Sequence, residues 1–160
     1  MKKKLIVYFS YTNNTKTIAE LIQKKLNCDI LRIETKVPYS NDYQTVVDDE
    51  QNSEASNHIP EIKDININLD EYDTIILGTP VWWYRPCPAI RAFLTKYDLS
   101  NKTIIPFATN AGWLGRTFKE IEKLANKSTI KSEKNIVFES YSSNLKTNKQ
   151  EIESWIETLK

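Results

Sequence analysis

Short apolar runs alternate with amphipathic stretches along the whole chain. Residues 5–9 are continuously apolar, which is typical of a parallel strand covered on both faces. Residues 15–26 then place their apolar side chains at helical spacing. The same alternation predicts four further strands, over 30–33, 74–78, 103–107 and 135–138, and three further helices, over 90–97, 118–125 and 149–159.

This order of elements indicates an α/β fold. Right-handed crossovers would place helices on both faces of a doubly wound, five-stranded parallel sheet of strand order 2-1-3-4-5. At 160 residues the chain is long enough for one domain, which we expect to span residues 1–160. The irregular part is residues 36–72, a connection far longer than usual, with a possible short helix over 43–54.

Composition and charge narrow the functional classes. Hydrophobic residues make up 40% and charged residues 27%, which excludes disordered, fibrous and disulfide-scaffold proteins. A net charge of +1 gives no general attraction to nucleic acid or membranes. The spacing of Cys28 and Cys87 matches no metal or redox pair and favours reduced thiols in a cytoplasmic protein. A single histidine, His58, excludes a histidine-rich metal site, and the apolar run at the N-terminus is too short for a signal peptide or membrane span.

Residues 42–73 are strongly acidic, with Lys63 as the only basic residue. A solvated helix and loop is the simpler interpretation, and an acidic docking face is the alternative. The ten acidic residues are Asp42, Asp48, Asp49, Glu50, Glu54, Glu61, Asp64, Asp70, Glu71 and Asp73.

In a sheet of this order, ligands bind beyond the carboxyl ends of the strands, where three loops converge. The loop after the first strand offers hydroxyl groups, amides and the backbone N–H groups of a helix start, which suit a single phosphate. It lacks the lysine of a triphosphate-binding loop, and a plain N-capping cluster is the alternative. Its candidate residues are Ser10, Thr12, Asn13, Asn14 and Thr15.

The second and third loops carry flat side chains and glycines. Aromatic rings can sandwich a flat ligand, and glycine allows close backbone approach, although core packing and a tight turn are the simpler alternatives. The candidates are Pro80, Val81, Trp82, Trp83 and Tyr84 in the second loop, and Thr109, Asn110, Ala111, Gly112 and Gly115, beside Trp113, in the third. Together the three loops describe a site for a planar ring on a phosphorylated tail.

These segments resemble those of flavodoxins. Residues 10–15 resemble the [ST]-x-T-G-N-T phosphate loop of that family, residues 78–83 its G-x-P-x-W segment, and residues 106–112 its fourth strand and the loop that follows. The resemblance implies FMN as cofactor, with its phosphate on residues 10–15 and its ring between the other two loops. Asn13 replaces the usual glycine, and asparagine is the next best residue for a positive φ.

The resemblance leaves two redox functions open. The first is a carrier that moves electrons between redox partner proteins, and the second is an FMN-dependent reductase in which a nicotinamide or quinone stacks on the flavin. A flavodoxin-like domain without its cofactor is a third possibility. The pI of about 7.7 differs from the acidic surfaces of the family, and no G-x-G-x-x-G motif for a nicotinamide domain occurs. Tyr39 and Tyr43 could reach the flavin edge, and packing of the insertion is the alternative.

Overall fold

The predicted parallel sheet forms the centre of the protein. The computed structural model describes residues 3–55 and 57–160, so Met1, Lys2 and Ser56 lie outside the described residues. The strand order is β2-β1-β3-β5-β6, which confirms the doubly wound fold. The sheet has seven strands in the described residues, and the five along this path are β1 (Lys4–Tyr8), β2 (Asp29–Arg32), β3 (Thr74–Trp82), β5 (Thr103–Asn110) and β6 (Thr129–Ile130).

The outer position beside β5 is shared by two short strands. β6 pairs with the beginning of β5 and β7 (Lys134–Val137) with its end. The carbonyl groups of Ile104 and Asn110 bond to residues of this outer side, and alternate residues of a strand face the same neighbour. Pro106 therefore faces the outer side too, where its missing N–H interrupts the ladder at the gap between β6 and β7.

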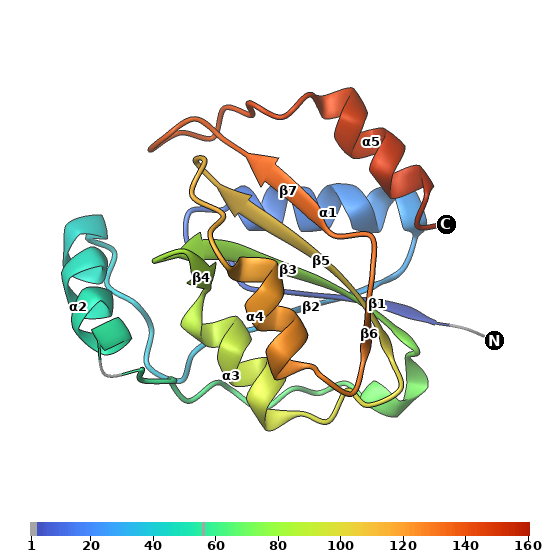
Figure 1. The fold of residues 1–160 in the computed structure, drawn as a ribbon, viewed down its shortest axis with the longest axis horizontal. Helices are drawn as coiled ribbons and strands as arrows, with labels where there is room; N and C mark the ends of the chain where they lie inside the picture. Colours follow the sequence, from blue (N-terminus) through green and yellow to red (C-terminus); the bar gives the residue numbers. More distant parts are fainter. Residues whose placement is uncertain (1–2, 56) are drawn as a thin grey trace.

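Helices cover both faces of the sheet, as Figure 1 shows. On one face Ile22 and Ile156 pack with Ile6, Ile76 and other buried residues. This face carries α1 (Asn14–Leu26) and α5 (Lys149–Glu157), and the other carries α3 (Pro88–Lys96) and α4 (Thr117–Leu124). Each predicted helix is present, with ends shifted by a few residues.

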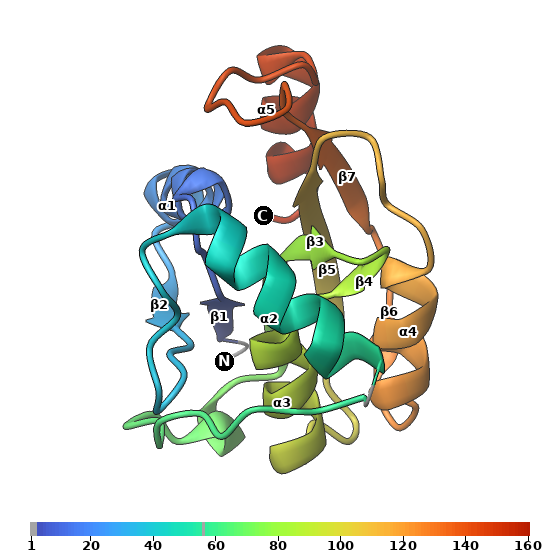
Figure 2. The same ribbon diagram turned by 90° about the vertical axis from the view of Figure 1, so that its left-hand side faces the viewer.

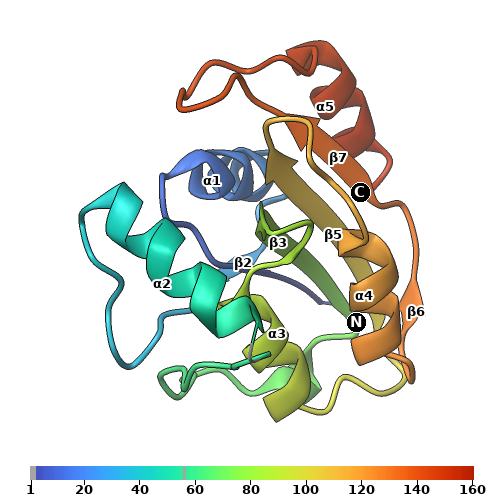
Figure 3. The same cartoon turned by 60° about the vertical axis from the view of Figure 1, so that its left-hand side comes forward.

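The long connection predicted over residues 36–72 leaves the sheet and returns to it, and its beginning pairs with a later part of the same connection. Thr35 and Ile62 form an antiparallel bridge, and the backbone N–H of Lys36 donates to the carbonyl oxygen of Glu61 at 3.0 Å. Between them lies α2 (Tyr43–Ala55), which matches the short helix expected over 43–54. Figures 2 and 3 show α2 running from the start of α1 toward α3, beyond the carboxyl ends of the central strands. A 3-10 helix, η1 (Leu69–Glu71), then leads into β3.

The strand expected over 74–78 is longer than predicted. β3 continues to Trp82 and turns back into β4 (Arg85–Pro86), with Val81 paired to Pro86 and Trp82 to Arg85. The second predicted loop is therefore mostly a β-hairpin, and only Trp83 and Tyr84 form its turn. The sequence prediction was wrong here because the segment contains no Asn-Gly or Asp-Gly pair to mark the turn.

Candidate functional site

The three predicted loops meet at the carboxyl edge of the sheet, and direct hydrogen bonds join them. The hydroxyl groups of Thr15 and Thr109 lie 2.7 Å apart and share a buried hydrogen bond between the first and third loops. The backbone N–H of Arg116 donates to the carbonyl oxygen of Tyr84 at 2.9 Å, which joins the third loop to the hairpin. The structure thus brings together segments that are about 100 residues apart in the sequence.

The first loop is shaped for an anion at the start of α1. Asn13 has a φ of 73°, the left-handed conformation for which asparagine was expected to substitute for glycine. Its side chain makes no capping hydrogen bond. The buried Ser10 accepts from the backbone N–H of Lys16 at 3.2 Å, whereas Thr12 and Asn13 are exposed. Asn14 is partly committed, because its side-chain amide donates to the carbonyl oxygen of Ser142 at 3.0 Å.

The hairpin turn holds two bulky residues in an unusual backbone conformation. Trp83 and Tyr84 have φ values of 54° and 65°, and both middle positions of such a two-residue turn normally favour asparagine or glycine. A residue held in this way costs on the order of 1–3 kcal/mol, and strain of this kind concentrates at ligand-binding sites. The sequence keeps flat side chains here despite the cost, so the turn is a candidate part of a ligand site.

The three aromatic residues of the hairpin have different environments. Trp82 makes edge contacts with Phe9, Tyr11 and Tyr39 at ring-centre distances of 5.9, 6.1 and 5.2 Å, so it packs the insertion against the sheet. Trp83 and Tyr84 are exposed. In the third loop Trp113 is 62% exposed and stands perpendicular to Tyr84 at 6.2 Å. In the hairpin and the third loop, the rings available to a flat ligand are therefore those of Trp83, Tyr84 and Trp113.

The third loop is ordered by one asparagine and two glycines. The Asn110 side-chain oxygen accepts from the backbone N–H groups of Gly112 and Trp113 at 2.9 and 3.0 Å. Gly112, at a φ of 112°, has open space where a side chain would stand. Gly115 approaches the backbone of Tyr84 so closely that a β-carbon would lie 2.6 Å from its carbonyl oxygen. Gly115 thus allows the third loop to approach the hairpin closely, not a ligand. Ala111 lies half-buried between these turns.

A partly buried charge network supports the hairpin, and sequence analysis did not identify it. Arg85 donates from two nitrogens to the carboxylate of Glu120 on α4. Burial alone raises the pKa of Glu120, but the hydrogen bonds and positive charge of Arg85, with Arg91 and Arg116 nearby, hold that pKa below its usual value. Arg85 and the buried Arg91 also approach the side-chain oxygen of Asn57, which follows α2, at 3.3 and 3.5 Å. No local motif marks these contacts, since 35 residues separate Arg85 from Glu120.

The insertion adds tyrosines to the first loop and the hairpin. The Tyr11 hydroxyl donates to the carbonyl oxygen of Ser40, and Tyr39 packs on Trp82. Burial raises the pKa of Tyr39 far above its ordinary value, so its hydroxyl stays protonated. Tyr43 lies 6.5 Å from Tyr11, ring centre to ring centre. Both insertion tyrosines therefore stand beside the candidate site.

Other parts of the described chain are less suited to chemistry. Within residues 3–55 and 57–160, no group of three or more His, Cys, Asp and Glu side chains could hold a metal ion, and no helix is long and apolar enough to cross a membrane. Cys28 and Cys87 are free thiols, and burial raises the pKa of Cys87 to about 11.

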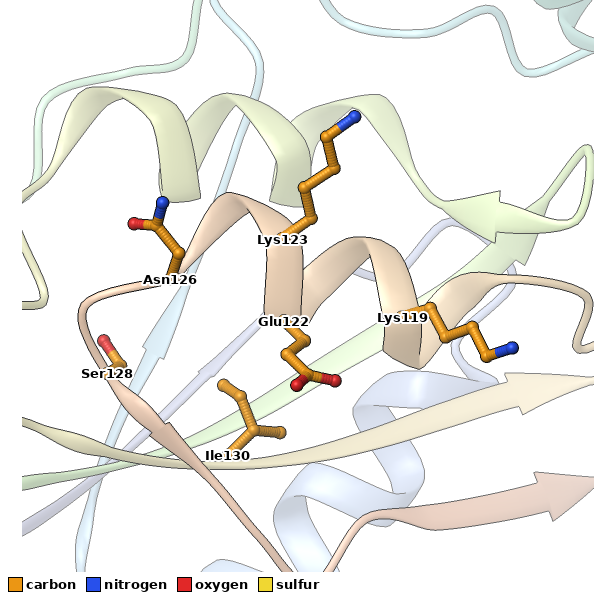
Figure 4. A pocket seen from close by; sticks show the side chains of 6 residues that line it. All are labelled: Lys119, Glu122, Lys123, Asn126, Ser128 and Ile130. Carbon is orange, nitrogen blue, oxygen red and sulfur yellow. The ribbon is translucent and has the colours of Figure 1, made fainter.

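A shallow pocket lies on the outer side of α4 and β6, away from the three loops. In Figure 4 the side chains of Lys119 and Lys123 point in different directions, and Glu122 lies beside Ile130. Its charged groups do not converge, so it carries no candidate function.

Comparison with known proteins decides the family. The family model described as Flavodoxin matches residues 3–159. The chain belongs to the flavodoxin family. No curated protein matches the chain.

Solved structures share this flavodoxin fold over nearly its full length. A flavoprotein from Lactobacillus acidophilus, crystallised in complex with FMN, superposes with a TM-score of 0.76 at 23% identity, covering 97% of this chain and 99% of that one. A putative flavoprotein from Bacteroides uniformis gives 0.77 at 24% identity, with 98% of each chain covered. One from Bacteroides eggerthii gives 0.75 at 25% identity, covering 99% and 98%.

Proposed function

We propose that this flavodoxin-family protein binds FMN and carries electrons between protein partners in the cytoplasm. The observation that carries the proposal is the meeting, at one sheet edge, of a helix start that Asn13 enters with a left-handed φ of 73° and a set of exposed aromatic rings. FMN has these two parts, a phosphate and a flat ring, at opposite ends of one molecule. Bound FMN supplies the redox chemistry, and the protein binds and orients it.

The first loop is the proposed phosphate site. Backbone N–H groups at the start of α1 face a dianion favourably, because they and the helix dipole present partial positive charge. The hydroxyl groups of Ser10, Thr12 and Thr15 and the amide groups of Asn13 and Asn14 supply further neutral donors. Hydrogen bonds to a charged group contribute about 1.5–3 kcal/mol each. The phosphate is therefore the main anchor of the cofactor.

The hairpin and the third loop are the proposed ring site. Trp83, Tyr84 and Trp113 have exposed rings, and the open space beside Gly112 leaves room for close approach to the backbone. Pro80, Val81 and Trp82 support the turn from β3. Thr109, Asn110, Ala111 and Gly115 fix the loop on the opposite side. The ring would lie between these two segments.

Charge favours a protein partner over a nicotinamide nucleotide. Five of the ten acidic residues of 42–73 lie in or directly before α2, at positions 42, 48, 49, 50 and 54, and Asp48 and Asp49 are exposed beyond the carboxyl edge. A negative surface repels the phosphates of NADH and NADPH and attracts a basic protein surface. The exposed ring of Trp113 favours the second candidate function, a reductase in which a small molecule stacks on the flavin.

Reduction by nicotinamide nucleotides separates the two functions. We expect the oxidised, FMN-loaded protein, mixed anaerobically with NADH or NADPH, to bleach with a half-time longer than about 100 s. The rate of flavin reduction would then be far below that of ordinary enzymatic turnover. Adding a basic NADPH-dependent flavoprotein reductase should accelerate bleaching, and the acceleration should decrease as salt screens the acidic surface. Bleaching within about one second by either nucleotide alone would establish the reductase instead.

A further inference from the structure

Two tyrosines from distant parts of the chain meet at the start of α1. Tyr43 is the first residue of α2, and Tyr141 lies in the loop after β7. Their ring centres are 5.6 Å apart with an angle of 80° between the planes, which is a favourable edge contact. In Figure 2, which looks toward the N-terminal end of α1, the first turn of α2 and the loop after β7 lie on opposite sides of that end.

The contact lies next to the proposed phosphate loop. Tyr43 also contacts Tyr11 of that loop, with ring centres 6.5 Å apart. On the opposite side, the side-chain amide of Asn14 donates to the carbonyl oxygen of Ser142, the neighbour of Tyr141. Tyr43 thus contacts the phosphate loop through its own ring, and the segment that carries Tyr141 is tied to that loop through the backbone of Ser142. Between them they join the insertion to the β7–α5 loop.

The loop that carries Tyr141 is held in shape by its own hydrogen bonds. Phe138 and Leu145 form a bridge, and the backbone N–H of Glu139 donates to the carbonyl oxygen of Asn144 at 2.8 Å. Tyr141 is near the tip of this excursion, with a φ of 53°, a conformation that disfavours bulky residues. The loop after β7 therefore holds the Tyr141 ring against Tyr43 of α2 in a strained backbone conformation.

The insertion holds Tyr43 in a similar way. The Thr45 hydroxyl donates to the carboxylate of Asp42, and the backbone N–H of Val46 donates to the carbonyl oxygen of Asp42 at 3.2 Å. The bridge between Thr35 and Ile62 closes the base of the insertion. The insertion and the β7–α5 loop, each held by its own hydrogen bonds, thus meet through a contact on the protein surface, since Tyr141 is 90% exposed. Such a contact can break without unfolding either segment.

We propose that Tyr43 and Tyr141 form an aromatic clasp over the phosphate loop that slows both the entry and the release of FMN. The inference rests on the proposed function, because the phosphate loop must hold the cofactor. The two rings contact each other and not FMN, so the clasp opens and closes with the same equilibrium constant in the apoprotein and in the FMN complex. An aromatic pair of this kind shifts such an equilibrium by about two- to tenfold. A clasp that hinders entry and release alike changes the two rates by the same factor and leaves the affinity nearly constant.

The test compares FMN kinetics in wild-type protein and the Tyr141→Ala variant. Association is followed by the loss of flavin fluorescence on mixing with apoprotein, and dissociation by transfer of FMN to an excess of a second apoflavoprotein. Both rate constants should rise by about two- to tenfold, while the Kd changes by less than about twofold. Tyr141→Phe keeps the ring and should retain wild-type rates. Val37→Ala removes a strongly exposed apolar side chain outside the ring pair of Tyr43 and Tyr141; it is the control and should change neither rate.

A double variant tests whether the two rings act as one unit. Tyr43→Ala combined with Tyr141→Ala should raise the rates by less than the product of the two single effects, because both substitutions remove the same ring contact. Unchanged rates in Tyr141→Ala overturn the clasp. A faster release matched by an equally weaker affinity also overturns it, because Tyr141 would then contact FMN directly. If wild-type protein binds no FMN, the proposed function itself fails, which is a different outcome from unchanged rates.

Discussion

Replacing Gly115 with alanine is expected to destabilise the protein by about 2–5 kcal/mol and to weaken FMN binding. A β-carbon at this position would lie 2.4 Å from the β-carbon of Tyr84 and 2.6 Å from its carbonyl oxygen. The Tyr84 backbone cannot retreat easily, because that carbonyl oxygen accepts the hydrogen bond from Arg116. The left-handed φ of 54° adds about 1–2 kcal/mol to an overpacking cost of about 1–3 kcal/mol. Urea unfolding and FMN titration measure the two effects.

Gly112→Ala is the matched control for this variant. Gly112 also has a positive φ, of 112°, but no atom lies within 4 Å of the position that a β-carbon would occupy. Its cost is limited to backbone strain, on the order of 1–3 kcal/mol. We expect its midpoint of unfolding to lie above that of Gly115→Ala. Equal losses of stability in the two variants would show that the contact between Gly115 and Tyr84 does not hold the third loop against the hairpin.

Gly78→Ala is expected to destabilise the protein by about 3 kcal/mol through the core. Gly78 in β3 pairs in register with Phe107 in β5, and a β-carbon on Gly78 would lie 2.3 Å from the tip of the phenylalanine ring. Phe107 is fully buried and its ring packs on Trp155 at 6.1 Å, so it has little room to move. The loss appears as a lower midpoint in urea unfolding. FMN affinity of the folded protein should change little.

A second substitution identifies the cause of that loss. Phe107→Leu shortens the side chain that meets position 78, and alone it leaves a cavity and lowers stability. Combined with Gly78→Ala, it should recover part of the loss, so the two effects should fall short of additivity by about 1 kcal/mol or more. Strict additivity would contradict the steric explanation, because the two positions would then act independently.

The hydrophobic pattern was sufficient for the sheet and its helices. Continuous apolar runs and helical spacing identified β1, β2, β3, β5 and β7 and the four helices packed on the sheet, whereas the acidic α2 was expected only as a possible short helix. The hydrophobic pattern did not predict segments whose conformation does not depend on burying apolar side chains. β6 has only two residues, too few to show a period, and the turn at Trp83 and Tyr84 uses residues that ordinarily avoid positive φ.

The candidate site was predictable as three loops but not as a connected structure. Topology alone places the ends of β1, β3 and β5 at one edge, so the segments could be inferred from their order. The contacts that shape them join positions far apart in the chain, such as Arg85 with Glu120 and Tyr43 with Tyr141. Such pairs depend on exact distances in the folded protein, which no local spacing encodes.

Titration of the apoprotein with FMN and with riboflavin tests the central claim most directly. The two ligands share the flat ring and differ in the phosphate, so the ratio of their affinities isolates the proposed phosphate loop at residues 10–15. Loss of two hydrogen bonds to a charged group, at about 1.5–3 kcal/mol each, predicts that riboflavin binds at least about 100-fold more weakly. Flavin absorbance and fluorescence report both titrations. Equal affinities for FMN and riboflavin, or no binding of FMN, would contradict the account.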